Sequence, residues 1–129
     1  MWRPIHAIRL ADQFPQSKKY VNKQWESLLE SPAHPEYVSA HSFFSGTAAV
    51  ILSKIYCSDK YKFRVQSDQF PNHKRKFNSF SSCAEEIEMS RLYGGIHYRF
   101  SNDSGIENGK KLGLYFYNQT LQPLTQSEK

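Results

Sequence analysis

The stretch His-Pro-Glu-Tyr-Val-Ser-Ala-His-Ser-Phe-Phe-Ser-Gly-Thr-Ala-Ala, residues 34–49, joins a turn to the start of a helix. Pro32 and Pro35 push the residues before them out of the α region, so no helix is expected upstream. Ser39 is the predicted N-cap, and small residues follow it. A helix that begins here points free backbone N–H groups, with a partial positive charge, at whatever lies in front of it. This predicts an anion site, beside which His41 can exchange a proton near neutral pH.

The composition favours a single folded domain with an anionic ligand. The chain has 129 residues, of which 39% are hydrophobic and 15% aromatic, and these values suit a modest core rather than a disordered chain. Its 17 Lys and Arg against 12 Asp and Glu give a net charge of +5, which favours an anionic partner over a cationic one. The basic run at residues 73–76 is expected to be a solvated loop, and no nucleic-acid partner is predicted.

Signals for membrane insertion, export and metal binding are missing from the sequence. The best apolar run, residues 48–52, is much shorter than a membrane span. No hydrophobic region of a signal peptide follows the first residues. Cys57 and Cys83 lack metal-type spacing, so we expect isolated thiols, with a disulfide as the alternative in an oxidising compartment.

Hydrophobic periodicity indicates a mostly helical chain. The expected helical segments, separated by a polar surface loop at 12–24 and an irregular region at 57–78, are 5–10, 25–29, 39–56, 81–94 and 104–121. Capping boxes are predicted at Ser81 or Ser82 with Glu85, and at Ser104 with Glu107. The tail from 124 to 129 is expected to be disordered. The predicted fold class is therefore all-α, part of a helical bundle.

Two local patterns refine this prediction. At residues 61–66 apolar and polar side chains alternate, which indicates a short strand that could pair with residues 77–80 in a small β-hairpin at about 61–80. In the last helix, Gly105, Gly109 and Gly113 fall four residues apart. One face of that helix therefore lacks side chains, which predicts close helix–helix packing, and the spacing does not match a phosphate-binding loop.

Arg91 and His97, six residues apart, form a second candidate site. On a straight helix six steps rotate a side chain by about 240°, so the two would face different directions. A break at Gly94 and Gly95 can return His97 to the side of Arg91. A histidine just past a helix end beside an arginine suits a nucleophile or ligand for an oxyanion. Taken alone, the pair equally fits a core histidine and a surface ion-pair former.

Three pieces of the chain resemble the signature of the vanadium-dependent haloperoxidases, which share their anion pocket with the type 2 phosphatidic acid phosphatase superfamily. That signature is Lys, six residues, Arg-Pro; then Pro-Ser-Gly-His; then Ser-Arg, five residues, His. The matching pieces are, in order, Arg3-Pro4, Ser39-Ala40-His41, and Ser90-Arg91 with His97. The sequence at residues 2–12, 34–39 and 90–97 is similar to that of the soluble bacterial haloperoxidase-like branch. The resemblance runs to about residue 123.

This resemblance implies an oxyanion pocket for vanadate or phosphate. Arg3 and Arg91 would bind the equatorial oxygens with their planar guanidinium groups. The Ser39 hydroxyl and the backbone N–H of Ala40 would point at the same oxygens.

Two histidines would carry the chemistry. The resemblance implies that His97 is the apical vanadate ligand or, with phosphate esters, the nucleophile that becomes transiently phosphorylated. His41 would be the acid–base group. One pocket can serve both chemistries because five-coordinate vanadate has the shape of an in-line phosphoryl-transfer transition state.

Three functions follow as alternatives. The first is peroxide-dependent oxidation of a halide, with vanadate as cofactor and a small anion or halide plus hydrogen peroxide as partners. The second is acid phosphatase-type hydrolysis of a phosphomonoester or lipid phosphate through phospho-His97. The third is a catalytically silent fragment that acts as a folded interaction module. Members of the family are commonly exported.

The chain departs from the family pattern in three places. Ala40 replaces the family glycine, and Val38 replaces the proline. The family lysine would lie seven residues before Arg3, where the sequence has no position. Residues 1–123 therefore resemble the C-terminal catalytic half of a larger helical domain. Missing helices would expose apolar surface, which predicts a homo-oligomer or pairing with an N-terminal portion.

Overall fold

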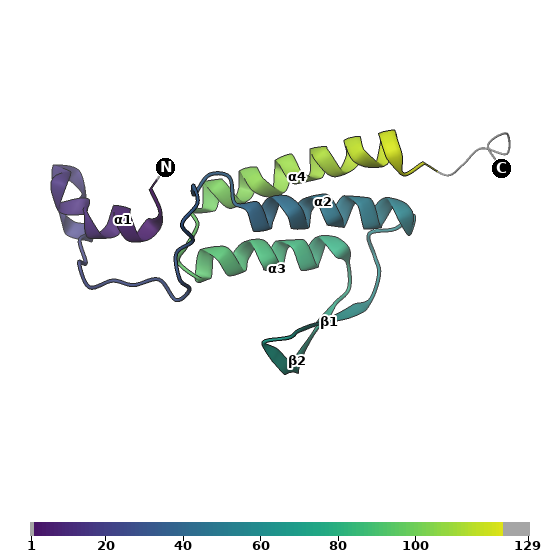
Figure 1. Cartoon of the computed structure of the whole chain (residues 1–129), viewed down its shortest axis with the longest axis horizontal. Coiled ribbons are helices and arrows are strands. Elements are labelled where there is room, and N and C mark those ends of the chain that lie inside the picture. The colour runs from purple at the N-terminus through teal and green to yellow at the C-terminus, as the bar shows by residue number, and fades with distance from the viewer. Residues whose placement is uncertain (1, 123–129) are drawn as a thin grey trace.

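Three long helices packed side by side form the body of the protein (Figure 1). The computed structural model describes residues 2–122. The predicted all-α bundle with a small hairpin is confirmed. Its elements are α1 (Pro4–Arg9), two 3₁₀ helices (Ala11–Gln13 and Pro15–Tyr20), α2 (Ala40–Ile55), β1 (Phe63–Ser67), β2 (Phe70–Phe77), α3 (Phe80–Tyr93) and α4 (Arg99–Thr120). The tail predicted at 124–129 lies outside the described residues.

Helices α2 and α4 approach each other closely because glycines line their contact. A Cβ at Gly113 would lie 2.7 Å from the Thr47 carbonyl oxygen, and a Cβ at Gly109 would overlap the Phe43 carbonyl oxygen. Real side chains do not reach such distances, so only glycine permits this spacing. The close packing predicted from the glycine ladder is confirmed, and α2 is the partner.

Both later helices begin earlier than predicted. Helix α3 starts at Phe80 because Ser79 is its N-cap: the Ser82 N–H donates to Ser79 Oγ (3.0 Å), and the Ser79 N–H donates to Ser82 Oγ (3.3 Å). The predicted box of Ser81 or Ser82 with Glu85 is therefore wrong. Helix α4 starts at Arg99, and the predicted cap Ser104 lies inside it.

The predictions from hydrophobic periodicity are also wrong for the segment before the bundle. The predicted loop at 12–24 contains the second 3₁₀ helix and the end of the first, and the predicted helical turn at 25–29 is irregular. Its backbone bonds to the end of α3 instead of to itself, since the Leu29 N–H donates to the Gly94 oxygen (3.1 Å). Gly95, with φ 72°, turns the chain sharply at this point. The segment is thus fixed by tertiary contacts.

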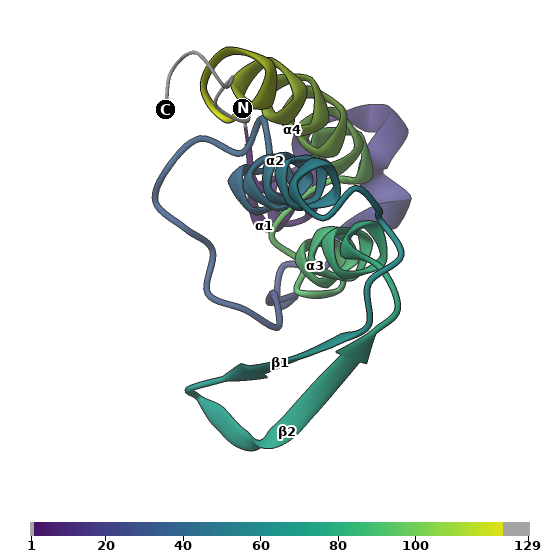
Figure 2. The ribbon, with the colours of Figure 1, turned by 90° about the vertical axis from the view of Figure 1, so that its right-hand side faces the viewer.

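The two-stranded hairpin projects away from the helices (Figure 2). Phe63 pairs with Phe77 across the antiparallel ladder, and the Phe63 ring also packs against Phe80 at 5.4 Å between centroids. These rings attach the hairpin to the start of α3. Residues 73–76 lie in β2, so the predicted solvated loop is wrong, although these residues are exposed.

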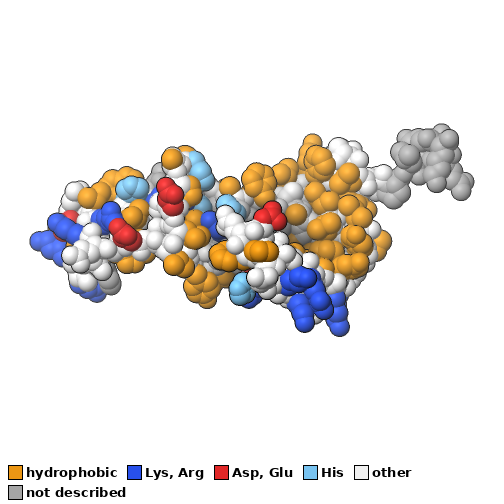
Figure 3. Space-filling view, turned by 60° about the horizontal axis from the view of Figure 1, so that its bottom comes forward, with side chains coloured by type: hydrophobic (Ala, Val, Ile, Leu, Met, Phe, Trp, Pro, Cys, Tyr) orange, Lys and Arg blue, Asp and Glu red, His pale blue; other side chains and the backbone are white. Residues whose placement is uncertain are grey.

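Apolar side chains remain widely exposed over the bundle. The buried cluster is small: Ala49, Phe80, Ala84 and Ile106. Large side chains such as Leu28 (83% exposed) and Phe44 (69%) face outward, and Figure 3 shows hydrophobic side chains gathered over one half of the visible face. The predicted exposed apolar surface is thus observed; the oligomer or N-terminal partner stays a prediction. Both cysteines are free, as expected. None of the described helices is long and apolar enough to cross a membrane.

Candidate oxyanion site

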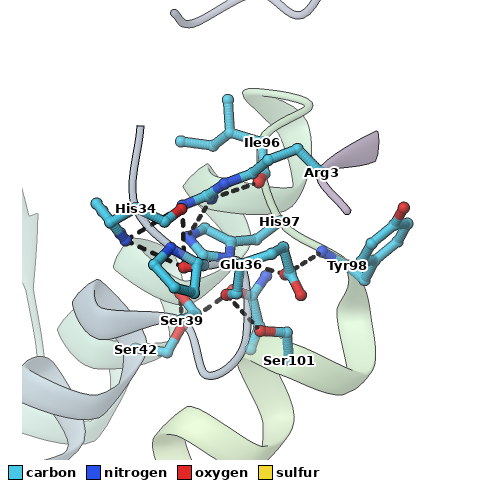
Figure 4. Close-up of polar contacts among 11 residues, drawn as sticks. Arg3, His34, Glu36, Ser39, Ser42, Ile96, His97, Tyr98 and Ser101 are labelled. Atoms are coloured by element: carbon cyan, nitrogen blue, oxygen red, sulfur yellow. Dashed lines mark hydrogen bonds and ion pairs between the residues drawn. The ribbon is translucent and has the colours of Figure 1, made fainter. Parts of the chain in front are cut away.

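Arg3 reaches from the start of α1 across to the turn between α3 and α4 (Figure 4). Its side chain is 3% exposed. Nη1 donates to the Ile96 carbonyl oxygen (2.8 Å) and to His97 Nε2 (3.1 Å). Nη2 donates to the carbonyl oxygens of His34 (2.9 Å) and Pro35 (3.3 Å). This one guanidinium group therefore holds together three segments that are far apart in the sequence.

His97 lies in the turn after α3 and is 2% exposed. A guanidinium group has only donors, so Nε2 must accept the bond from Arg3 and Nδ1 must carry the ring proton. Nδ1 lies 2.9 Å from Glu36 Oε1, which accepts that proton. Burial holds the pKa of His97 below its usual value; Glu36 opposes this effect and the charge of Arg3 adds to it. The ring is consequently neutral near pH 7, with the Nε2 lone pair turned toward Arg3.

Arg91, in the last turn of α3, joins the same cluster. The break at Gly94 and Gly95 brings the chain back, and the His97 N–H donates to the Arg91 carbonyl oxygen (3.3 Å). Burial, and then the nearby charge of Arg3, lowers the pKa of Arg91. Within residues 2–122, the Nε atoms of Arg3 and Arg91 are buried and lack a hydrogen-bond partner. Two neighbouring cations with unsatisfied donors fit an anion of several oxygens.

His41 lies in the first turn of α2 and is exposed. Desolvation is the largest cause of its lowered pKa, followed by the charges of Arg91, His97 and His34. The His41 ring therefore lies within electrostatic range of these three side chains. The ring is neutral near pH 7 and is able to accept a proton.

Ser39 is the N-cap of α2 by position, as predicted, but its side chain does not cap the helix. It is fully buried, and its hydroxyl lies 3.0 Å from Ser42 Oγ, which also contacts Asn102 Oδ1 at 3.1 Å. Its N–H donates to the Ser101 oxygen (3.3 Å). This buried polar group fixes the start of α2 against α4. Ala40 is the first residue of α2, where helix N–H groups have no intrahelical acceptor.

The structure thus brings Arg3, Arg91, His41 and His97 into one electrostatic neighbourhood, while the Ser39 hydroxyl turns to the α2–α4 contact. Sequence reasoning missed Glu36, which is fully buried against His97. Glu36 stands 61 residues from His97, and a lone carboxylate between a proline and a tyrosine gives no periodic signal.

Comparison with known proteins agrees with the resemblance seen in the sequence. The family model described as the VCPO second helical-bundle domain matches residues 1–126. The chain belongs to this family. A search of curated proteins gives no match.

Solved structures of bacterial vanadium-dependent haloperoxidases share the fold of this VCPO-type domain. The first bacterial vanadium-dependent iodoperoxidase is 33% identical with a TM-score of 0.77, over 90% of this chain and 26% of that one. The holo-type bacterial chloroperoxidase is 19% identical (TM-score 0.62, 74% of this chain, 23% of that one). The apo-type is 18% identical (0.69, 90% and 30%). The chain therefore spans less than a third of the length of the structures it matches.

Proposed function

We propose that this chain provides the oxyanion-binding part of a vanadate-dependent haloperoxidase, which oxidises a halide with hydrogen peroxide. The observation that carries the proposal is the pair of buried guanidinium Nε donors without a partner in residues 2–122: Arg3 bonds to His97, and the charge of Arg91 acts on the same ring. Arg3 and Arg91 carry two positive charges against the single carboxylate of Glu36. An oxyanion would satisfy these donors and balance the remaining charge.

The residues present fit vanadate. His97 Nε2 would be its protein ligand, and Arg3 with Arg91 would hold its oxygens, with the α2 N–H groups at Ala40 as further donors. The Ser39 hydroxyl would have to turn from Ser42 to join them. Bound vanadate supplies the centre that activates hydrogen peroxide for two-electron oxidation of the halide. Phosphate has the same tetrahedral oxygens, so the same residues would bind it in the phosphatase alternative.

Arg3 must move when the oxyanion arrives. Its Nη1 donates to His97 Nε2, and one lone pair cannot accept that bond and bind the oxyanion at the same time. The same guanidinium group would then turn from the imidazole to the anion. In the free protein, Arg3 therefore protects His97 Nε2 from water. Because Arg3 must be displaced from the imidazole, the net affinity for the oxyanion is lower.

His41 would move the proton. Desolvation and the charges of Arg91 and His97 keep its ring neutral, so it can take a proton from hydrogen peroxide and return it to the departing water oxygen. A cation at this position would instead be repelled by Arg91. Its exposure leaves it in contact with solvent, from which the proton consumed in halide oxidation is supplied.

Peroxide-dependent oxidation of iodide and bromide by the full chain, with and without vanadate, tests the proposal against phosphate release from a phosphomonoester. Halide oxidation that requires vanadate supports it. Phosphate release that vanadate inhibits would replace it with the phosphatase function. Absence of both, with no anion binding, would leave a folded interaction module.

A matched pair of arginine variants separates the site from general charge effects. Arg91→Gln removes a cation beside His97, whereas Arg64→Gln removes one from the exposed strand β1. Vanadate-dependent turnover should fall in the first and stay within about twofold in the second. Equal losses in both would mean that net charge, rather than the site, governs the reaction.

A further inference from the structure

Glu36 has no contact with solvent; its carboxylate accepts two hydrogen bonds and its backbone carbonyl accepts a third. It is 0% exposed, and its Oε1 accepts from His97 Nδ1 (2.9 Å) and from the Tyr98 backbone N–H (3.1 Å). Its carbonyl oxygen accepts from Ser101 Oγ in α4 (3.2 Å). Both the backbone and the side chain of Glu36 are thereby fixed to the segment that carries His97 (Figure 4).

These bonds determine which nitrogen of the imidazole ring is available as an acceptor. The Tyr98 N–H requires an acceptor at Oε1, so this oxygen cannot turn away from the ring. Oε1 in turn requires a donor from His97, which places the ring proton on Nδ1. Nε2 is then left as the acceptor, on the opposite side of the ring and next to Arg3. Glu36 and Arg3 thus hydrogen-bond to the two nitrogens of the imidazole, one on each side of the ring.

Burial makes this arrangement specific. A buried carboxylate is costly unless its oxygens are hydrogen-bonded, and the second oxygen, Oε2, has no partner within residues 2–122. All hydrogen bonds observed to the Glu36 carboxylate therefore go to His97 and to the residue after it. A buried carboxylate with one unpaired oxygen is poor evidence for a stabilising role. Its hydrogen bonds instead fix the orientation of the His97 ring.

We propose that Glu36 is a positioning residue for the oxyanion site: it holds the His97 ring with Nδ1 protonated, so that Nε2 presents its lone pair to the oxyanion. The inference rests on the proposed function for its consequence, but the ring arrangement is measurable without any anion. Partners of this kind orient metal-ligating histidines, and their loss typically weakens ligand binding about 10–100-fold.

The test compares Glu36→Ala and Glu36→Gln with the full wild-type chain. In ¹⁵N-labelled protein, the buried, hydrogen-bonded Nδ1–H of His97 should give a slowly exchanging downfield proton signal, assigned by its loss in His97→Gln. We expect this signal to disappear in Glu36→Ala and vanadate affinity to fall about 10–100-fold. Glu36→Gln should keep the signal and most of the affinity, because the Tyr98 N–H holds the amide oxygen at the position of Oε1.

Two results would overturn the inference. One is a folded Glu36→Ala whose ring signal and vanadate affinity match the wild type. The other is a Glu36→Gln that loses the ring signal; this variant also keeps the test valid if Glu36→Ala does not fold. Failure of the proposed function looks different: the wild-type chain would bind no vanadate while its Nδ1–H signal still depended on residue 36.

Discussion

Replacing Arg91 with glutamine should weaken anion binding without weakening the fold. In the free protein the Arg91 guanidinium lies close to the charge of Arg3, has a buried Nε without a partner in residues 2–122, and has a lowered pKa through burial. Its charge is therefore unfavourable until an anion is present. Arg91→Gln removes that repulsion, so the midpoint of thermal unfolding should stay equal or rise.

The loss in affinity follows from the hydrogen bonds that Arg91 would donate to the oxyanion. A hydrogen bond to a charged group contributes about 1.5–3 kcal/mol, which corresponds to a dissociation constant about 10- to 150-fold higher. Equilibrium dialysis of vanadate against the wild type, Arg91→Gln and the control Arg64→Gln measures this change. A folded Arg91→Gln that binds vanadate within threefold of the wild type would refute the reasoning, as would an equal loss in Arg64→Gln.

Three further predictions concern the fold that carries the site. Gly109→Ala should lower the free energy of unfolding by about 1–3 kcal/mol in urea, because its Cβ would overlap the Phe43 carbonyl oxygen; an unchanged midpoint would mean that α2 and α4 are further apart. Ser79→Ala should cost about 0.5–2 kcal/mol through loss of the α3 capping box, whereas Ser81→Ala should not remove that box. Burial holds the pKa of His97 below 6.5, so the unfolded chain takes up protons first as the pH falls, and stability should drop below about pH 6.5. This slope should flatten in His97→Gln, and a slope equal to the wild type would exclude His97 as its source.

The helices that could be predicted are those whose signal lies in their own residues. The small residues of α2 and the spacing of Gly105, Gly109 and Gly113 indicated both the helices and their close contact. The start of α4 was missed because Tyr98 is its N-cap and offers no side-chain cap. Periodicity failed at 25–29 because Leu29 bonds to Gly94, a contact across the fold that local sequence cannot reveal.

The same difference between local signals and contacts across the fold decided what could be predicted of the site. The pairing of Arg91 with His97 was predictable because a glycine break lies between them in one short segment. The oxyanion-binding roles proposed for Arg3 and Ser39 depended on family resemblance, since these residues lie far from His97 in the sequence. Glu36 was not found because a buried carboxylate is recognised by what surrounds it, and its partner is 61 residues away.

The most direct test of the account measures by ⁵¹V NMR how many vanadate ions the full chain binds and whether phosphate displaces them. We predict one saturable site per chain, displaced by phosphate and abolished in His97→Gln, with His73→Gln on the exposed hairpin as the control that binds normally. Binding that is absent, unsaturable or unchanged in His97→Gln would contradict the claim that Arg3, Arg91 and His97 form an oxyanion site.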